Sequence, residues 1–321
     1  MAYRFEPDES VRDGFVRSAA EQLDEAISEL SERIGDDPVD AVHSARKAVK
    51  KERALLRLVR DSMPAKRRRR ENRTLRDAAR GLSAARDAEA MIDTMDGLAE
   101  RYAGQVPEST FHAVREQIAR ARDEERRELV GSALGDRAVG ELGAVRLRVS
   151  EWELDRGGWR ALEGGLRRSY KDGRRAYKRA RSHRGAEDWH EWRKRVKDLW
   201  YHQRLLARVA GPVVNGQAKD AHRLADLLGD THDLDVLRDA LVRGRFHAPV
   251  DTDALVRLID HRRDELQTEA LWVAARVYAE KSQAFVQRVR QSWEAGRGQA
   301  AAARDQHPQD LAYATRTPHP V

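Results

Sequence analysis

A basic motif occurs twice in this sequence, and the two copies are separated by a constant 147 residues. Each copy has a histidine, an Arg-Lys pair three residues later, a Lys seven residues later and an Arg fourteen residues later. The two copies are His43, Arg46, Lys47, Lys50 and Arg57, and His190, Arg193, Lys194, Lys197 and Arg204. A repeat that preserves a cationic pattern predicts two halves with the same plan, which share one anionic ligand.

The spacing inside each motif indicates an α-helix. Residues three, four and seven apart lie on one face of a helix, so the basic residues of each copy form a cationic strip. The opposite face is apolar in both copies, with Val49 and Leu55 in the first and Trp192 and Val196 in the second. Like charges at this spacing cost a helix stability. An anion that neutralises the strip explains the pattern better than folding does, although a solvated surface face remains the alternative.

Composition and periodicity predict an all-α chain. The 321 residues are 40% hydrophobic and 36% charged, and no run alternates like a strand. We expect residues 1–155 to form a first helical bundle, residues 156–295 a second, and residues 296–321 a disordered tail. In the first half, helices are expected over 8–34, 38–61 and about 65–101, then from 106–107, with a further helix ending near 152. In the second half, one helix should end at Gly211-Pro212 and another should run from about 251 to 293.

Charge is segregated along the chain, although the net charge is only +7. Residues 1–40 carry 4 basic and 12 acidic residues, whereas residues 41–80 carry 15 and 4, and residues 165–204 carry 14 and 5. Two separated basic blocks indicate a polyanion partner. The run Lys66–Arg70 is typical either of a nucleic-acid or localisation patch or of a solvated helix start.

The paired motif resembles the CHAD family, the conserved-histidine α-helical domain. The segments Leu82–Asp87, Leu228–Asp235 and Gly165–Arg168 support the resemblance, which covers about residues 5–295. It implies two four-helix bundles related by a pseudo-two-fold axis around a basic cleft or pore. It also implies binding of inorganic polyphosphate without hydrolysis, and association with polyphosphate granules.

The resemblance assigns polyphosphate contacts to basic positions in both halves. They are His43, Arg46, Lys47, Lys50, Arg57, Arg174, Arg175, Lys178, His190, Arg193, Lys194, Lys197 and Arg204. The first half departs from the pattern because its opening helix is acidic and because Arg86 stands where the second half has His232. A strictly symmetric pore is therefore not expected.

No pattern in the sequence predicts catalysis, a cofactor or a metal site. Cysteine is absent, and the glycine spacing of residues 135–140 lacks the Lys of a phosphate-binding loop. Asp233 and Asp235 could hold Mg²⁺, but carboxylates two apart on a helix point in different directions, so pairing with Arg is favoured. The alternative function is binding of DNA or RNA by the same basic faces, which lack stacking aromatic residues. Without an apolar span or a signal-peptide core, the chain is expected to be cytoplasmic and to associate with polyphosphate granules rather than a membrane.

Overall fold

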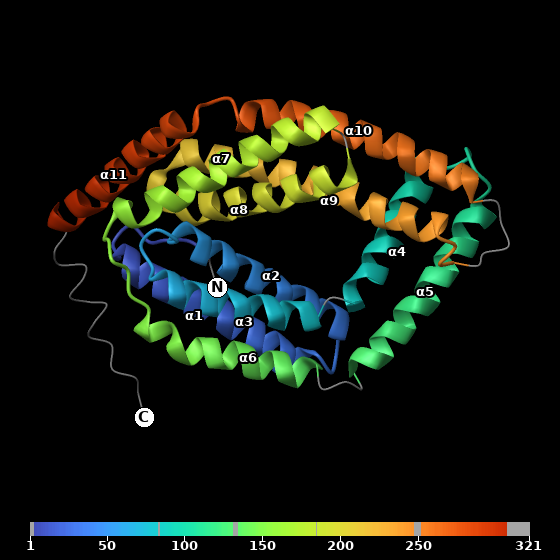
Figure 1. Ribbon diagram of the computed structural model, residues 1–321, viewed down its shortest axis with the longest axis horizontal. Helices are drawn as coiled ribbons and strands as arrows, with labels where there is room; N and C mark the ends of the chain where they lie inside the picture. The colour runs from blue at the N-terminus through green and yellow to red at the C-terminus, as the bar shows by residue number, and fades with distance from the viewer. Residues whose placement is uncertain (1–2, 83, 131–133, 184, 247–251, 307–321) are drawn as a thin grey trace.

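The computed structural model describes residues 3–82, 84–130, 134–183, 185–246 and 252–306, which form helices joined by short connections (Figure 1). The helices of the first half are α1 (Val11–Ser28, extended by a π-helical turn Glu29–Arg33), α2 (Pro38–Leu58), α3 (Ala65–Gly81), α4 (Ala84–Arg101), α5 (Glu108–Val130) and α6 (Leu134–Arg148), followed by a 3₁₀ turn Val149–Glu151. Those of the second half are α7 (Trp159–His183), α8 (Ala186–Ala210), α9 (Pro212–Val242), α10 (Asp253–Val277) and α11 (Ser282–Gln306). The one β pairing in this described part is an isolated bridge between Ala103 and Val106, so the prediction of an all-α fold is confirmed.

Capping residues fix the start of α2 at the predicted Pro38 and the start of α1 at Val11, three residues after the predicted one. The Asp37 side chain accepts a hydrogen bond from the Asp40 backbone N–H at 3.2 Å, and Pro38 occupies the first turn of α2. The Ser10 hydroxyl accepts from the Asp13 N–H at 3.0 Å and caps α1 in the same way. Gly211, with φ of +80°, separates α8 from α9.

Two predicted long helices are each divided in the structure, so those predictions were wrong. The segment 65–101 forms α3 and α4, which separate after Leu82, and the segment 251–293 forms α10 and α11, which separate at residues 278–281. Packing explains both breaks, because α3 lies against α6 whereas α4 lies against α5 and α9. Likewise α10 lies along α9, whereas α11 covers α7 and α8.

Helix α11 also continues to Gln306, through residues 296–306 for which a disordered tail was predicted. The helix is held there by contacts with distant segments. Gly296 lies so close to α8 that a Cβ on it would clash with the Val209 carbonyl, and Arg297 donates to the Glu9 carbonyl oxygen at 2.7 Å. Arg304 forms an ion pair with Asp8 at 3.0 Å. The remainder of the predicted tail, residues 307–321, lies outside the described residues.

The helices assemble into two groups joined by a hairpin (Figure 1). Helices α1, α2, α3 and α6 pack together, and α7, α8, α9 and α11 form the other group with α10 along α9. The α4–α5 hairpin lies at one end and reaches α9. Buried side chains form one cluster that includes Trp152 and Trp159 on either side of the boundary predicted at residues 155–156. The division into two repeated bundles stays a prediction.

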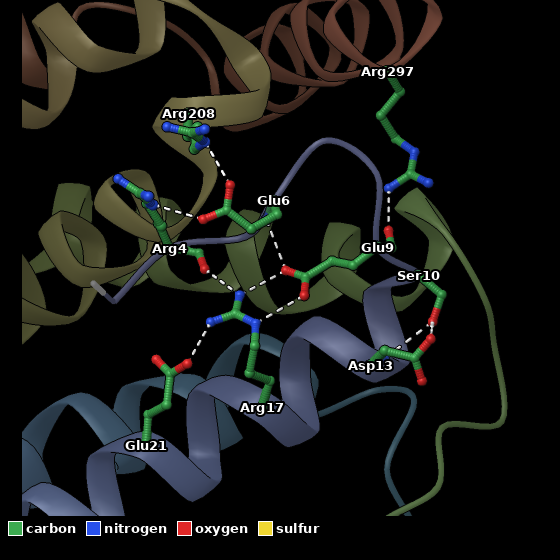
Figure 2. A network of polar contacts seen from close by, with 9 residues as sticks. All are labelled: Arg4, Glu6, Glu9, Ser10, Asp13, Arg17, Glu21, Arg208 and Arg297. Atoms are coloured by element: carbon green, nitrogen blue, oxygen red, sulfur yellow. Dashed lines mark hydrogen bonds and ion pairs between the residues drawn. The ribbon is translucent and has the colours of Figure 1, made fainter. Parts of the chain in front are cut away.

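The two groups meet most closely where α2 ends beside α7. A Cβ on Gly165 would lie 1.9 Å from the Leu58 carbonyl oxygen, so only glycine permits this approach of the two backbones. The N-terminal segment adds a second link, because the Phe5 N–H donates to the Leu205 carbonyl oxygen of α8 at 2.9 Å. Figure 2 shows the polar network around this segment, in which Arg17 binds Glu9 and Glu21. These contacts tie the first helix group to α7 and α8 of the second.

Candidate functional site

Helices α2 and α8 carry the two copies of the basic motif, and each buries the face opposite that motif. On the face of α2 opposite the motif, the buried apolar side chains include Ala41, Ala45, Ala48, Val49, Leu55 and Leu56, and on that of α8 they include Trp192, Val196, Leu199 and Leu206. The assignment of apolar faces from the sequence is therefore correct. The helices touch through His202, whose Nε2 lies 2.8 Å from the Ala54 carbonyl oxygen and donates to it. This contact fixes how the two polar faces lie beside each other.

A cavity of about 390 Å³ lies between α2 and α8, with α4 and α9 at its side. We call it the α2–α8 cleft. Its lining residues are Arg46, Lys50, Arg53, Arg57, Ala90, Met91, His190, Glu191, Arg193, Lys194, Arg195, Lys197, Asp198, Tyr201, His232, Asp233 and Val236. Eight of these are Arg or Lys and three are Asp or Glu. Positive charge from both motif helices therefore exceeds negative charge in one cleft.

Seven of the thirteen predicted site residues line the α2–α8 cleft: Arg46, Lys50, Arg57, His190, Arg193, Lys194 and Lys197. Among the other six, Lys47 and Arg204 are exposed and lie outside the lining. Arg174, Arg175 and Lys178 belong to α7 and also lie outside it. His43 lines a neighbouring cavity instead. The structure thus places together the core of each motif but not its whole length.

Two arginines and one histidine in the lining were not predicted as site residues from the sequence. Arg53 follows Arg46 by seven positions and Lys50 by three, so helical spacing alone could have found it. Its counterpart in the second copy is Trp200, so Arg53 is not part of the repeated basic motif. Arg195 lies beside the motif, and His232 comes from α9. Neither carries a local signal for this cleft.

An ion pair and a hydrogen bond hold two of the cleft arginines in place. Arg57 Nη1 lies 3.0 Å from Asp198 Oδ1 and joins α2 to α8. Arg53 Nε donates to Asn72 Oδ1 of α3 at 3.1 Å. Burial raises the pKa of Asp198, and the positive charge of Arg57 opposes that rise. Burial and the charge of Arg57 lower the pKa of Arg53 to about 10. Arg53 is therefore still protonated at neutral pH. Burial destabilises its positive charge, and a bound anion would stabilise it.

His190 and His232 face each other in the cleft. Their Nδ1 atoms lie 3.3 Å apart and their ring centroids are separated by 4.5 Å. Burial, together with the charges of Lys194 and Arg193, lowers the pKa of His190. At neutral pH this ring is therefore mainly neutral, so one imidazole can donate to the other. An anion placed here would favour the protonated form of His190.

A larger cavity of about 1010 Å³ adjoins the cleft and shares Ala90 and Asp233 with it. We call it the α4–α5 cavity. Its charged and titratable lining residues are Asp37, Asp40, His43, Glu89, Asp93, Glu100, Arg101, Arg122, Arg126, Asp230, Asp233 and Arg262. Seven are acidic and four are arginine, so this cavity has the opposite charge balance from the cleft. His43 therefore lies in surroundings that are much less favourable to an anion.

In the described part of the chain, no group of three or more His, Asp or Glu side chains is placed to hold a metal ion. A search of the same residues finds no helix with the length and apolarity needed to cross a membrane.

Comparison with known families decides how this helical arrangement is classified. The CHAD domain family matches residues 17–242. The chain belongs to the CHAD family. Among solved structures, PptA from Streptomyces chartreusis has a similar fold with a TM-score of 0.59 at 15% identity, covering 86% of this chain and 100% of PptA. The CHAD domain from the plant Ricinus communis has a TM-score of 0.54 at 17% identity, covering 93% of this chain and 95% of that domain. No curated protein matches the sequence.

Proposed function

We propose that this CHAD protein binds inorganic polyphosphate in the α2–α8 cleft and does not cleave it. The observation that carries the proposal is the convergence of eight Arg and Lys side chains, from two helices, on one cleft with three carboxylates. Polyphosphate carries about one negative charge per phosphate and presents no bases to read, so a binder needs charge density and hydrogen-bond donors. Membership of the CHAD family, which is known for polyphosphate binding, supports this choice of ligand.

The chemistry of the cleft favours binding over reaction. Arg46, Arg193 and their neighbours can donate to phosphate oxygens, and the guanidinium plane suits paired oxygens. Hydrolysis of a phosphoanhydride generally calls for metal ions held by carboxylates. The cleft carboxylates Glu191 and Asp198 are instead engaged with arginine or lysine, since Glu191 pairs with Lys194 at 2.7 Å. We further propose that polyphosphate binding brings the protein to polyphosphate granules.

Calorimetric titration with size-defined polyphosphate tests the proposal. Counterion release predicts an affinity that falls steeply with salt, with a slope of log affinity against log salt of about −0.7 per phosphate contact. A change of Arg193→Ala together with Lys197→Ala should lower affinity strongly. The matched control is Arg120→Ala with Arg243→Ala, which removes the same charge from side chains that are 70% and 77% exposed.

Equal losses in the two double variants, or binding that does not respond to salt, would contradict the proposal. Duplex DNA provides a third comparison, because a nucleic-acid binder would prefer it at matched charge. If DNA binds more tightly than polyphosphate and depends on the same cleft residues, the protein binds nucleic acid instead.

A further inference from the structure

The exposed face of α3 carries a row of arginines that the cleft does not include. Arg69, Arg73, Arg76 and Arg80 follow one another at spacings of four, three and four residues, and all are exposed. Such spacing places them on one face of the helix. We call this row the α3 stripe. It extends over 12 residues, and its 11 residue-to-residue steps give a length of about 16 Å at roughly 1.5 Å per step.

Side-chain contacts place this helix directly against the cleft arginines of α2. Arg46 Nη1 donates to the Ala79 carbonyl oxygen at 3.4 Å, and Arg53 Nε donates to Asn72 Oδ1 at 3.1 Å. As the α2 residue number rises by seven, the α3 number falls by seven, so the helices run antiparallel side by side. The α3 stripe therefore flanks the α2 side of the cleft along its length.

Few carboxylates compensate the stripe. Asp77 is the acidic residue within it, and it pairs with Arg76 at 2.9 Å. The charges of Arg80 and Arg73 also act on Asp77, and the hydrogen bond from Arg76 is the largest cause of its lowered pKa. Over its whole length α3 has eight Arg or Lys and two Asp or Glu. The four guanidinium groups of the stripe thus share one carboxylate and retain a strong positive field.

The helix that flanks the α8 side of the cleft has the opposite character. Helix α9 packs against α8, and it has three Arg or Lys and six Asp. Two of these, Asp230 and Asp233, line the acidic α4–α5 cavity. An anionic chain leaving the cleft toward α9 or α4 would be repelled, whereas one leaving over α2 meets the α3 stripe.

We propose that the α3 stripe is an outer binding track for polyphosphate, onto which a chain that fills the α2–α8 cleft continues. This inference rests on the proposed function and extends it from a cleft to a cleft with a flanking track. A short chain occupies the cleft alone, whereas a long chain contacts both surfaces. The protein therefore distinguishes polyphosphate by chain length.

The test compares tripolyphosphate with polyphosphate of about 100 phosphates by calorimetric titration near 0.15 M salt. The stripe variant is Arg73→Gln, Arg76→Gln and Arg80→Gln. Its control is Arg120→Gln, Arg243→Gln and Arg290→Gln, three exposed arginines that also lie beside carboxylates. Each lost phosphate contact removes the release of about 0.7 counterions. At this salt concentration the loss of three contacts predicts a roughly fifty-fold weaker affinity for the long chain, whereas the affinity for tripolyphosphate should not change.

The other outcomes separate this inference from the proposed function. Long-chain affinity within twofold of the control, or an equal loss for both chain lengths, would overturn the track. A stripe variant that loses duplex DNA binding but keeps long-chain polyphosphate binding would assign the stripe to nucleic acid and overturn it as well. If Arg193→Ala with Lys197→Ala leaves tripolyphosphate binding intact, the cleft is not the binding site. The proposal that the α3 stripe continues it is then also wrong. Thermal unfolding of each variant, with midpoints close to that of the unchanged protein, verifies that binding is compared between folded proteins.

Discussion

The buried carboxyl of Glu52 makes the stability of the first helix group depend on pH. Glu52 lies on α2 with no exposed surface, and neither of its carboxyl oxygens has a hydrogen-bond partner among the described residues. Burial, with a further contribution from the charge of Glu71, raises the pKa of Glu52 from 4.5 to about 8. Glu71 is itself buried and pairs with Arg148 at 2.6 Å, so its charge is fixed nearby. At neutral pH the folded protein therefore holds Glu52 protonated.

The sign and size of the effect follow from proton linkage. Between pH 4.5 and 8 the unfolded chain has lost this proton and the folded chain keeps it, so the free energy of unfolding falls as pH rises. The slope is about 1.4 kcal/mol per pH unit, which gives a loss of about 3 kcal/mol between pH 4.5 and pH 7. Above pH 8 both states are ionised and the slope vanishes.

Glu52→Gln keeps a neutral side chain of similar shape in both states and should remove this dependence. The difference in free energy of unfolding, variant minus unchanged protein, should therefore depend on pH. We expect this difference to be about 3 kcal/mol larger at pH 7 than at pH 4.5. Urea unfolding followed by circular dichroism at several pH values between 5 and 8 measures the difference directly. If the difference in free energy of unfolding between the two proteins stays constant over this range, Glu52 does not keep its proton in the folded protein.

Three further predictions concern other named positions. Burial lowers the pKa of His202 to about 4. As pH falls from 6.5 to 4, the free energy of unfolding of the unchanged protein should therefore fall by about 3 kcal/mol relative to that of His202→Gln. Urea unfolding that shows the same pH dependence of stability in both proteins would contradict this. Gly165→Ala forces a Cβ against the Leu58 carbonyl and should lower the free energy of unfolding by about 2 kcal/mol. Gly140→Ala on α6, where a Cβ would have nothing within 4 Å, should raise it by up to about 1 kcal/mol. If thermal unfolding does not rank Gly165→Ala as the less stable variant, the clash is excluded. Bound polyphosphate should raise the lowered pKa of His190, so affinity measured by calorimetry should increase as pH falls from about 8 to about 6, and His190→Gln should abolish that increase.

Local patterns in the sequence were sufficient to predict α2 and α8 and the orientation of their faces. The His-Arg-Lys spacing, the Asp37-Pro38 cap and the apolar residues opposite the motif all depend on interactions within one helix. For the same reason seven of the predicted residues share one cleft once the two helices lie side by side. The contact that brings the helices together, between His202 and Ala54, links residues 148 positions apart and has no local signature.

The breaks in the long helices and the place of His43 depend on tertiary packing. Residues 65–101 have no proline, and the chain turns after Leu82 because α3 and α4 cover different neighbours. The α4–α5 hairpin then encloses the first turns of α2, so His43 lies in an acidic cavity although its repeat partner His190 lies in the cleft. The equivalence of the two copies in sequence could not reveal this difference, because it arises from the packing of α4 and α5 against the first turns of α2.

The central claim is that polyphosphate lies between the two motif helices, and a crystal structure with bound tripolyphosphate tests it most directly. We expect phosphate oxygens within hydrogen-bond distance of Arg46 and Lys50 from α2 and of Arg193 and Lys197 from α8. Phosphates held by residues of one helix alone, or bound outside the α2–α8 cleft with these four side chains uninvolved, would contradict it.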